Sequence, residues 1–394
     1  MTLSQKLQNC RTEARLTQQQ VADVLHVPRE SISMWEKGNR VPGLRQLEDL
    51  ARLYSVSVDF LLGKEEVDSR PREREFLCRG LVNEPAVHME LSRWFDFLDG
   101  WADIIESAGL VWNNTGKPPK KLDRGPDFTD SRAAPTVAAE VRTFYDVGTD
   151  AIPDLYSFLD EQDILVCKAN LGDWSDPGQT GISGAFHNHP KLGYCILVNA
   201  QNSLGRQSFT LAHEFAHALF HYNSRSLISI RKDSSPREFF ADAFATHFLV
   251  PTKEINKLID NWGWKARLDA HKAIELAYVF RVSYVFMLYR LRNEKHISEE
   301  QRQQWSGLSP AALAQQLGLD ASVFNKPGSQ VLNLNRYPAS VLQTVRDLIQ
   351  QDELYVSQAA DLLAVSQAQV QSLLLSEPAR ATESEQKEVC EFAF

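Results

Sequence analysis

The stretch RQSFTLAHEFAHALFH, residues 206–221, decides how the larger part of this chain is expected to fold. Its many apolar residues predict a buried helix, and it contains the pattern HExxH. Residues four apart on a helix lie roughly 40° apart around its axis, so His213 and His217 can turn their ring nitrogens to one metal ion. Glu214 lies beside them, where it can take a proton from water at that ion. The pattern therefore predicts a catalytic Zn²⁺ site.

A catalytic zinc site needs a third protein ligand and keeps a fourth position for water. His221 lies one further turn along the helix, roughly 80° around the axis from the first histidine, and is less suitable; Asp233 lies in a polar loop. The better candidate is Glu238, at the start of EFFADAFATHFLVP, residues 238–251, which predicts the next helix. Asp242 shares its face and can accept the other ring N–H of a metal-bound histidine.

Three further histidines are interpreted as unrelated to this site. His247 is expected to be a surface or core residue. His187 and His189 are spaced as a second metal pair would be, but they fall within residues 171–190, which are rich in Gly, Asp and Pro and predict turns. A polar loop is the preferred interpretation for this pair.

The segments 206–221 and 238–251 resemble the ImmA/IrrE family of zinc metallopeptidases. The resemblance extends over about residues 136–295 and implies a zincin-like domain, in which an edge strand, here expected at 194–199, precedes the metal helix. The family more often has Asn at the position of Asp242. Carried over to this chain, the resemblance implies the metal ligands His213, His217 and Glu238 and the general base Glu214.

Residues 16–38, LTQQQVADVLHVPRESISMWEKG, predict two short helices joined by a tight turn. Thr17 and Gln20 form a capping-box pattern, Ala22 is small where the helices cross, and Val27 and Ile32 fill the corner. Over residues 3–63 the chain resembles the XRE helix-turn-helix family of phage repressors, which implies five helices and a dimer on a palindromic operator.

By this resemblance the head presents a set of DNA-contacting residues: Gln18 to phosphate, Arg29, Glu30, Ser33 and Met34 to the major groove, and Lys37 and Arg40 to the backbone. Arg11 and Glu36 are expected to form an internal ion pair. Eight basic and seven acidic residues give segment 1–63 a charge of +1, against −9 for the 394-residue chain. This weak positive charge leaves open a head that docks a protein or no longer binds DNA.

The whole chain is predicted to be mainly α with a small β-sheet, an α+β fold. Its expected parts are a helix-turn-helix domain (1–66), a charged linker and helical connector (67–135), the peptidase domain (136–298) and a C-terminal helical region (299–394). Within that last region, residues 338–375 again resemble a helix-turn-helix but lack a basic face, so packing is the preferred role. Five scattered cysteines and the lack of a long apolar run predict a cytoplasmic protein that does not enter membranes.

The sequence thus predicts a DNA-binding transcriptional regulator with a zinc endopeptidase. The family is linked to cleavage of XRE-type repressors under stress, so the expected substrate is a repressor, another partner or the chain itself. Self-cleavage is expected in the charged segment 64–75 or the Pro/Gly-rich segment 112–135. The alternative is a transcription factor whose peptidase-like domain senses a ligand or partner with little proteolysis.

Overall fold

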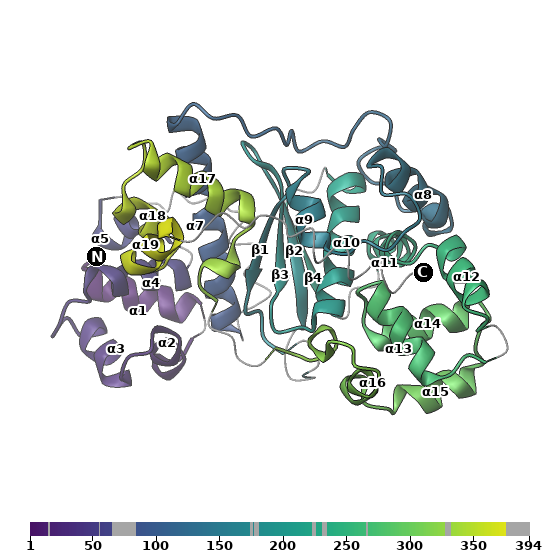
Figure 1. Ribbon diagram of the computed structural model, residues 1–394. Helices are drawn as coiled ribbons and strands as arrows, with labels where there is room; N and C mark the ends of the chain where they lie inside the picture. The colour runs from purple at the N-terminus through teal and green to yellow at the C-terminus, as the bar shows by residue number, and fades with distance from the viewer. Residues whose placement is uncertain are drawn as a thin grey trace. The chain divides into compact units, whose positions relative to one another are not determined.

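The computed structural model describes residues 1–14, 16–54, 56–64, 84–173, 176, 181–222, 226–230, 235–264, 267–327 and 332–375 (Figure 1). The chain divides into two compact units, residues 1–101 with 170–181, and residues 102–169 with 182–394. The predicted four-part division is finer than this and stays a prediction. Nearly all of the charged segment 64–75 lies outside the described residues, as does Asp233. No described helix is both long and apolar enough to span a membrane.

The first unit begins with the five short helices that the sequence predicts. They are α1 (Leu3–Glu13), α2 (Gln18–Leu25), α3 (Arg29–Glu36), α4 (Leu44–Leu53) and α5 (Val58–Leu62). The capping box of Thr17 and Gln20 is confirmed at the start of α2. Val21, Ala22 and Ile32 are at most 1% exposed, so the crossing of α2 and α3 forms the centre of the small core.

The second unit contains a four-stranded sheet of order β1-β3-β2-β4 (Figure 1). Its strands are β1 (Leu165–Ala169), β2 (Ile182–His189), β3 (Gly193–Asn199) and β4 (Ser226–Ile230). β1 runs parallel to β3, while β2 is antiparallel to β3 and β4. The small sheet confirms the predicted fold class, but β3, which precedes the helix with the HExxH pattern, is an interior strand and not the expected edge strand.

The helices of the second unit continue to residue 375, and among them α10 packs on β2 and β3 and α9 packs on β1. They are the end of α7 (Pro85–Ser107), then α8 (Ala134–Phe144), α9 (Leu155–Asp160), α10 (Leu204–Phe220), α11 (Pro236–Leu249), α12 (Thr252–Asn261), α13 (Ala270–Val279), α14 (Tyr284–Asn293), α15 (Glu299–Ser306), α16 (Pro310–Gln316), α17 (Ala339–Gln350), α18 (Val356–Leu362) and α19 (Gln367–Leu375). Short 3₁₀ turns lie at Ser131–Ala133, Ala321–Val323 and Leu334–Arg336.

Helix α10 packs on β2 and β3 with one face and on α11 with another, which places it in the core (Figure 1). Aromatic rings of the two helices fill their contact: Phe215, Phe220, Phe240, Phe244 and Phe248, each at most 1% exposed. The buried Arg142 of α8 donates from Nη1 to the Phe248 carbonyl at 2.5 Å and from Nε to the Gly148 carbonyl at 2.7 Å. Burial lowers the pKa of Arg142 to about 10. The end of α11 is thereby fixed to α8.

Candidate metal centre and DNA interface

Helices α10 and α11 bring together the three side chains that the sequence predicts as metal ligands. His213 Nε2 lies 3.0 Å from His217 Nε2 and 3.0 Å from Glu238 Oε2, and His217 Nε2 lies 3.1 Å from Glu238 Oε1. Ligand atoms around a tetrahedral zinc ion with bonds of ~2.0–2.1 Å are about 3.3 Å apart. This triangle has nearly that size, and within the described residues it is the one group of His, Cys, Asp or Glu found that suits a metal ion.

The bond on the outer side of His213 determines which of its nitrogens faces the triangle. Its Nδ1 lies 2.9 Å from Asp242 Oδ1, and an ionised carboxylate can only accept, so Nδ1 carries a proton. Burial lowers the pKa of His213, but the bonds to Asp242 and Glu238 outweigh it and raise the pKa to about 10. The surroundings therefore stabilise a positive charge at Nε2, which a proton or a metal ion can supply.

Glu214, the predicted general base, is fully buried on α10 beside the triangle. It acts electrostatically on His213, and its carboxylate lies against Gly184 of β2, where an added Cβ would be 3.0 Å from Glu214 Oε1. The same Cβ would be 2.6 Å from Thr210 Cγ2. A glycine at position 184 thus lets the strand approach the helix closely enough to enclose the carboxylate.

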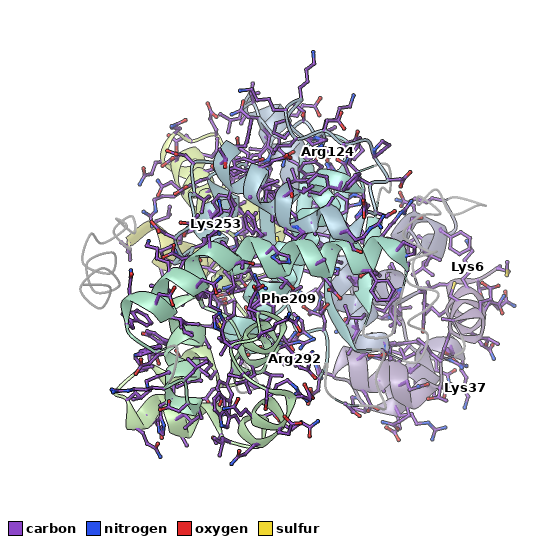
Figure 2. All side chains as sticks on the ribbon, turned by 90° about the vertical axis from the view of Figure 1, so that its right-hand side faces the viewer. Lys6, Lys37, Arg124, Phe209, Lys253 and Arg292 are labelled. Atoms are coloured by element: carbon purple, nitrogen blue, oxygen red, sulfur yellow. The ribbon has the colours of Figure 1, made fainter. Side chains whose placement is uncertain are left out.

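Two aromatic side chains lie one after the other next to His213, the first of the predicted ligands. The ring of Phe209, which is labelled in Figure 2, lies 6.4 Å from that of His213 and 5.4 Å from that of Phe286 of α14 (centroid distances). These rings restrict the access of water to the ligand ring, which strengthens electrostatic interactions at the triangle.

The remaining histidines lie outside the triangle. His221 Nδ1 contacts His217 Nδ1 at 2.7 Å, on the side of that ring away from Glu238. Burial lowers the pKa of His221 to about 3. His247 Nδ1 lies 3.3 Å from Arg290 Nη2 on the distant part of α11. Of the alternatives for the third ligand that the structure describes, Glu238 alone joins both motif histidines.

His187 and His189 lie on β2, so the predicted polar loop is wrong. The sequence does not predict this strand, because the Gly and Asn residues within it are poor strand formers and hide the alternation. His189 is buried, and its Nδ1 accepts from the backbone N–H groups of Lys191 and Leu192, both at 3.2 Å, in the turn to β3. That bonding gives His189 a structural role in the hairpin.

The predicted ion pair lies inside the head. Arg11 Nε lies 2.6 Å from Glu36 Oε1, and Arg11 Nη2 lies 3.0 Å from Glu36 Oε2. Gln18 Nε2 also donates to Glu36 Oε2, at 2.9 Å. Gln18 is therefore part of this internal network, and a phosphate contact by its amide would compete with the bond to Glu36.

The other predicted DNA contacts share one surface of the head. Arg29 and Glu30 are exposed at the start of α3, while Ser33 and Met34 are half-buried further along it. Lys37 and Arg40 are exposed just beyond the helix, and Figure 2 shows Lys37 at the surface. The arrangement offers two kinds of contact: side chains along α3 for base edges, and the cations of Lys37 and Arg40 beyond the helix for phosphates.

The corner between α2 and α3 combines an alanine, a left-handed residue and a valine, and among the described residues of the second unit this combination recurs twice. In the head, His26 has a left-handed φ of 51° and the Val27 N–H donates to the Ala22 carbonyl at 3.0 Å. Between α13 and α14, Arg281 has φ 52°, and the bond from Val282 to Ala277 is also 3.0 Å. Between α18 and α19, Ala364 has φ 48°, with a 3.0 Å bond from Val365 to Ala360.

The three corners differ in the surface of their second helix. On α14 the residues that correspond to Arg29 and Ser33 are Tyr284 and Leu288, which are at most 1% exposed. On α19 the matching surface is exposed but uncharged, with Gln367, Ala368, Gln371 and Ser372. Of the corners in the described residues, the head alone presents an exposed arginine at the start of its second helix.

Comparisons with known proteins match the same two regions. Residues 7–61 match a helix-turn-helix family model, and residues 159–292 match the model of the IrrE N-terminal-like peptidase domain. The HTH-type transcriptional regulator ImmR of Bacillus subtilis (strain 168) is 38% identical over 130 residues, which is 33% of this chain and 95% of ImmR. The HTH-type transcriptional activator BcrR of Enterococcus faecalis is 42% identical over 67 residues, 17% of this chain and 33% of BcrR.

Proposed function

Because the chain belongs to the XRE-type helix-turn-helix transcriptional regulators and carries an IrrE N-terminal-like peptidase domain, we propose that it binds operator DNA with its head and cleaves a protein with zinc held by His213, His217 and Glu238. The observation that carries the catalytic half is the triangle of ligand atoms with a buried glutamate next to it.

The chain's own residues prepare the site for hydrolysis. Zinc, when bound, polarises the scissile carbonyl and makes water more acidic. Glu214 takes the proton from the attacking water and returns it to the leaving amine. Its burial beside β2 keeps the carboxylate in place and out of bulk solvent. Asp242 holds the Nδ1 proton of His213, which keeps Nε2 directed at the metal position.

The exposed arginine and the flexible cations of the head support the DNA-binding half of the proposal. Arg29 reads a base in the major groove, and Lys37 and Arg40 contact phosphates. XRE-type heads bind palindromes as dimers, so we propose a homodimer on its operator. A peptidase bound there is held close to any repressor at the same operator, which raises its effective concentration toward that substrate.

Two segments are proposed for self-cleavage. Segment 64–75 joins the head to the rest of the chain, so a cut there releases the head. The other, segment 112–135, is bonded to the metal centre: Arg237, next to the ligand Glu238, pairs with Asp127. A cut in this second segment would disturb the enzyme itself, which favours the first for a switch that ends repression.

Incubation of the zinc-loaded chain with the regulators encoded beside it tests this function. We expect mass spectrometry to show cleavage of a partner or of the chain itself by the wild type and none by Glu214→Gln, while both proteins hold zinc. If neither protein is cut, and Glu214→Gln leaves gene regulation unchanged, the peptidase-like domain acts as a ligand or partner sensor.

A further inference from the structure

A short segment far from HExxH in sequence is bonded to the end of the metal helix. We call residues 123–128 the strap. The Phe128 N–H donates to the Phe220 carbonyl, at the last residue of α10, at 3.2 Å, and the Phe128 carbonyl accepts from His221 Nε2 at 2.8 Å. The backbone N–H and the carbonyl of Phe128 thus both form hydrogen bonds at the C-terminal end of α10.

These bonds determine the proton positions of two histidines. A carbonyl oxygen only accepts, so His221 carries its proton on Nε2 and offers Nδ1 as an acceptor. His217 Nδ1, 2.7 Å away, then donates to it. The Nε2 lone pair of His217 is left facing His213 and Glu238. His217 and His221 are both 0% exposed, so water does not compete for these bonds.

We propose that His221 and the Phe128 carbonyl form a positioning relay that holds His217 in its metal-binding tautomer, and that the strap thereby sets the affinity for the metal. This proposal rests on the zinc site proposed above and concerns a residue outside the ligand set. His221 cannot bind the same ion in this arrangement, because its Nδ1 meets the side of the His217 ring away from Glu238.

The strap is held to the metal helices by more than the relay. The Phe128 ring packs 5.2 Å from that of Phe240 of α11 and 6.3 Å from that of Phe220 (centroid distances). Tyr222 donates its hydroxyl to Asp123 at 2.9 Å, and Asp127 pairs with Arg237 beside the third ligand. Displacement of the strap would therefore disturb His217 and the start of α11 together.

The two histidine ligands are supported in different ways. His213 is oriented by Asp242, whose side chain is 57% exposed, whereas His217 is oriented by a buried histidine and a backbone carbonyl. The strap is bonded to the support of the second ligand through His221, whereas the bond between His213 and Asp242 involves no strap residue. The affinity for the metal is thereby linked to the conformation of the strap.

Zinc competition with a chromophoric chelator tests the relay in the full-length chain. His221→Leu removes both bonds, and we expect roughly 10–100-fold weaker zinc binding, the usual effect of losing an outer partner of a metal histidine. His221→Gln carries both an acceptor and a donor and should recover much of that loss. His271→Ala, an exposed histidine bonded to Gln316, is the matched control and should bind zinc as the wild type does. Wild-type affinity in a folded His221→Leu protein, or no recovery in His221→Gln, overturns the relay.

Nitrogen NMR of the histidine rings provides a readout that does not depend on zinc or on proteolysis. In the metal-free wild type, His217 should show a proton on Nδ1, and this tautomer preference should be lost in His221→Leu. A chain that binds no zinc but keeps this tautomer would contradict the proposed enzyme and leave the relay intact. A visible spectrum of bound Co²⁺ that keeps its tetrahedral pattern in His221→Leu shows that no ligand was removed.

Loosening the strap without touching a nitrogen tests its contribution. Phe128→Ala removes the ring that packs against Phe240, so the carbonyl is held less firmly, and we expect weaker zinc binding than in the wild type. Phe144→Ala, at the 40% exposed end of α8, is the control for the loss of a phenyl ring. Equal zinc affinity for both variants would show that the strap does not set metal affinity.

Discussion

Asp242 Oδ1 lies 2.9 Å from Nδ1 of His213, while Glu238 Oε2 lies 3.0 Å from Nε2 of the same ring. One imidazole thus bridges two carboxylates of α11, one directed to solvent and one at the proposed metal position. The two acids are four residues apart, so the helical repeat places them on one side of α11. The geometry thus gives the two acids different roles: Glu238 is a proposed metal ligand, and Asp242 orients the ring of another proposed ligand, His213.

Substitution of Asp242 tests this difference in roles. Asp242→Leu should weaken zinc binding roughly 10–100-fold, because the Nδ1 proton loses its acceptor. Asp242→Asn should bind nearly as well as the wild type, since its amide oxygen still accepts. Competition titrations on the three proteins measure the effect. Equal losses in the two variants would mean that the charge of Asp242, and not its bond to His213, supports the site.

Loss of a ligand should have a larger effect than loss of any neighbouring histidine. The purified chain should hold about one zinc ion, and Glu238→Ala should lose most of it at metal concentrations where the wild type is saturated. His247→Ala should retain its zinc, because its ring contacts Arg290 and not the triangle. Metal analysis after dialysis distinguishes the variants, and full retention by Glu238→Ala would remove Glu238 from the ligand set.

Gly184→Ala should destabilise the peptidase unit and disturb Glu214. Its Cβ would lie 2.6 Å from Thr210 Cγ2 and 2.8 Å from the Leu197 carbonyl, so the free energy of unfolding should fall by about 1–3 kcal/mol. Chemical denaturation measures the loss. Gly307→Ala, whose Cβ would meet an atom only at 3.6 Å, should show almost no change. Equal stability of the two variants would show that β2 and α10 adjust without strain.

The DNA binding of the head should respond differently to the loss of Arg29 and to the loss of Lys37. Arg29→Ala should reduce operator binding by ~1–3 kcal/mol and relax the base preference at one position. Lys37→Ala should weaken binding to all sequences about equally and reduce its salt dependence. Gln371→Ala on α19 is the control and should leave binding unchanged. Random-site selection and binding titrations at several salt concentrations measure these effects. If neither the 1–66 fragment nor the full chain shows a sequence preference, the head is a protein-docking module.

The sequence predicted the parts of the site that depend on local spacing. The helix with His213 and His217 and the acids of α11 follow from helical periodicity, and the structure places them together. The contact of Phe128 with His221 joins residues 93 apart, and no spacing rule reports it. The sequence does not predict β2, because residues such as Gly184 are poor strand formers, although the close approach of this strand to α10 requires a residue without a side chain.

The recurring corner of alanine, left-handed residue and valine shows how a motif search would misjudge this protein. Such a search would count three DNA readers in the described residues, because the backbone geometry and the buried positions agree in all of them. This corner is a turn that sets the angle between two short helices. The surface residues of the second helix decide what that helix contacts, and such a search does not score them. A count of DNA-binding helices that is based on the turn alone is therefore too high.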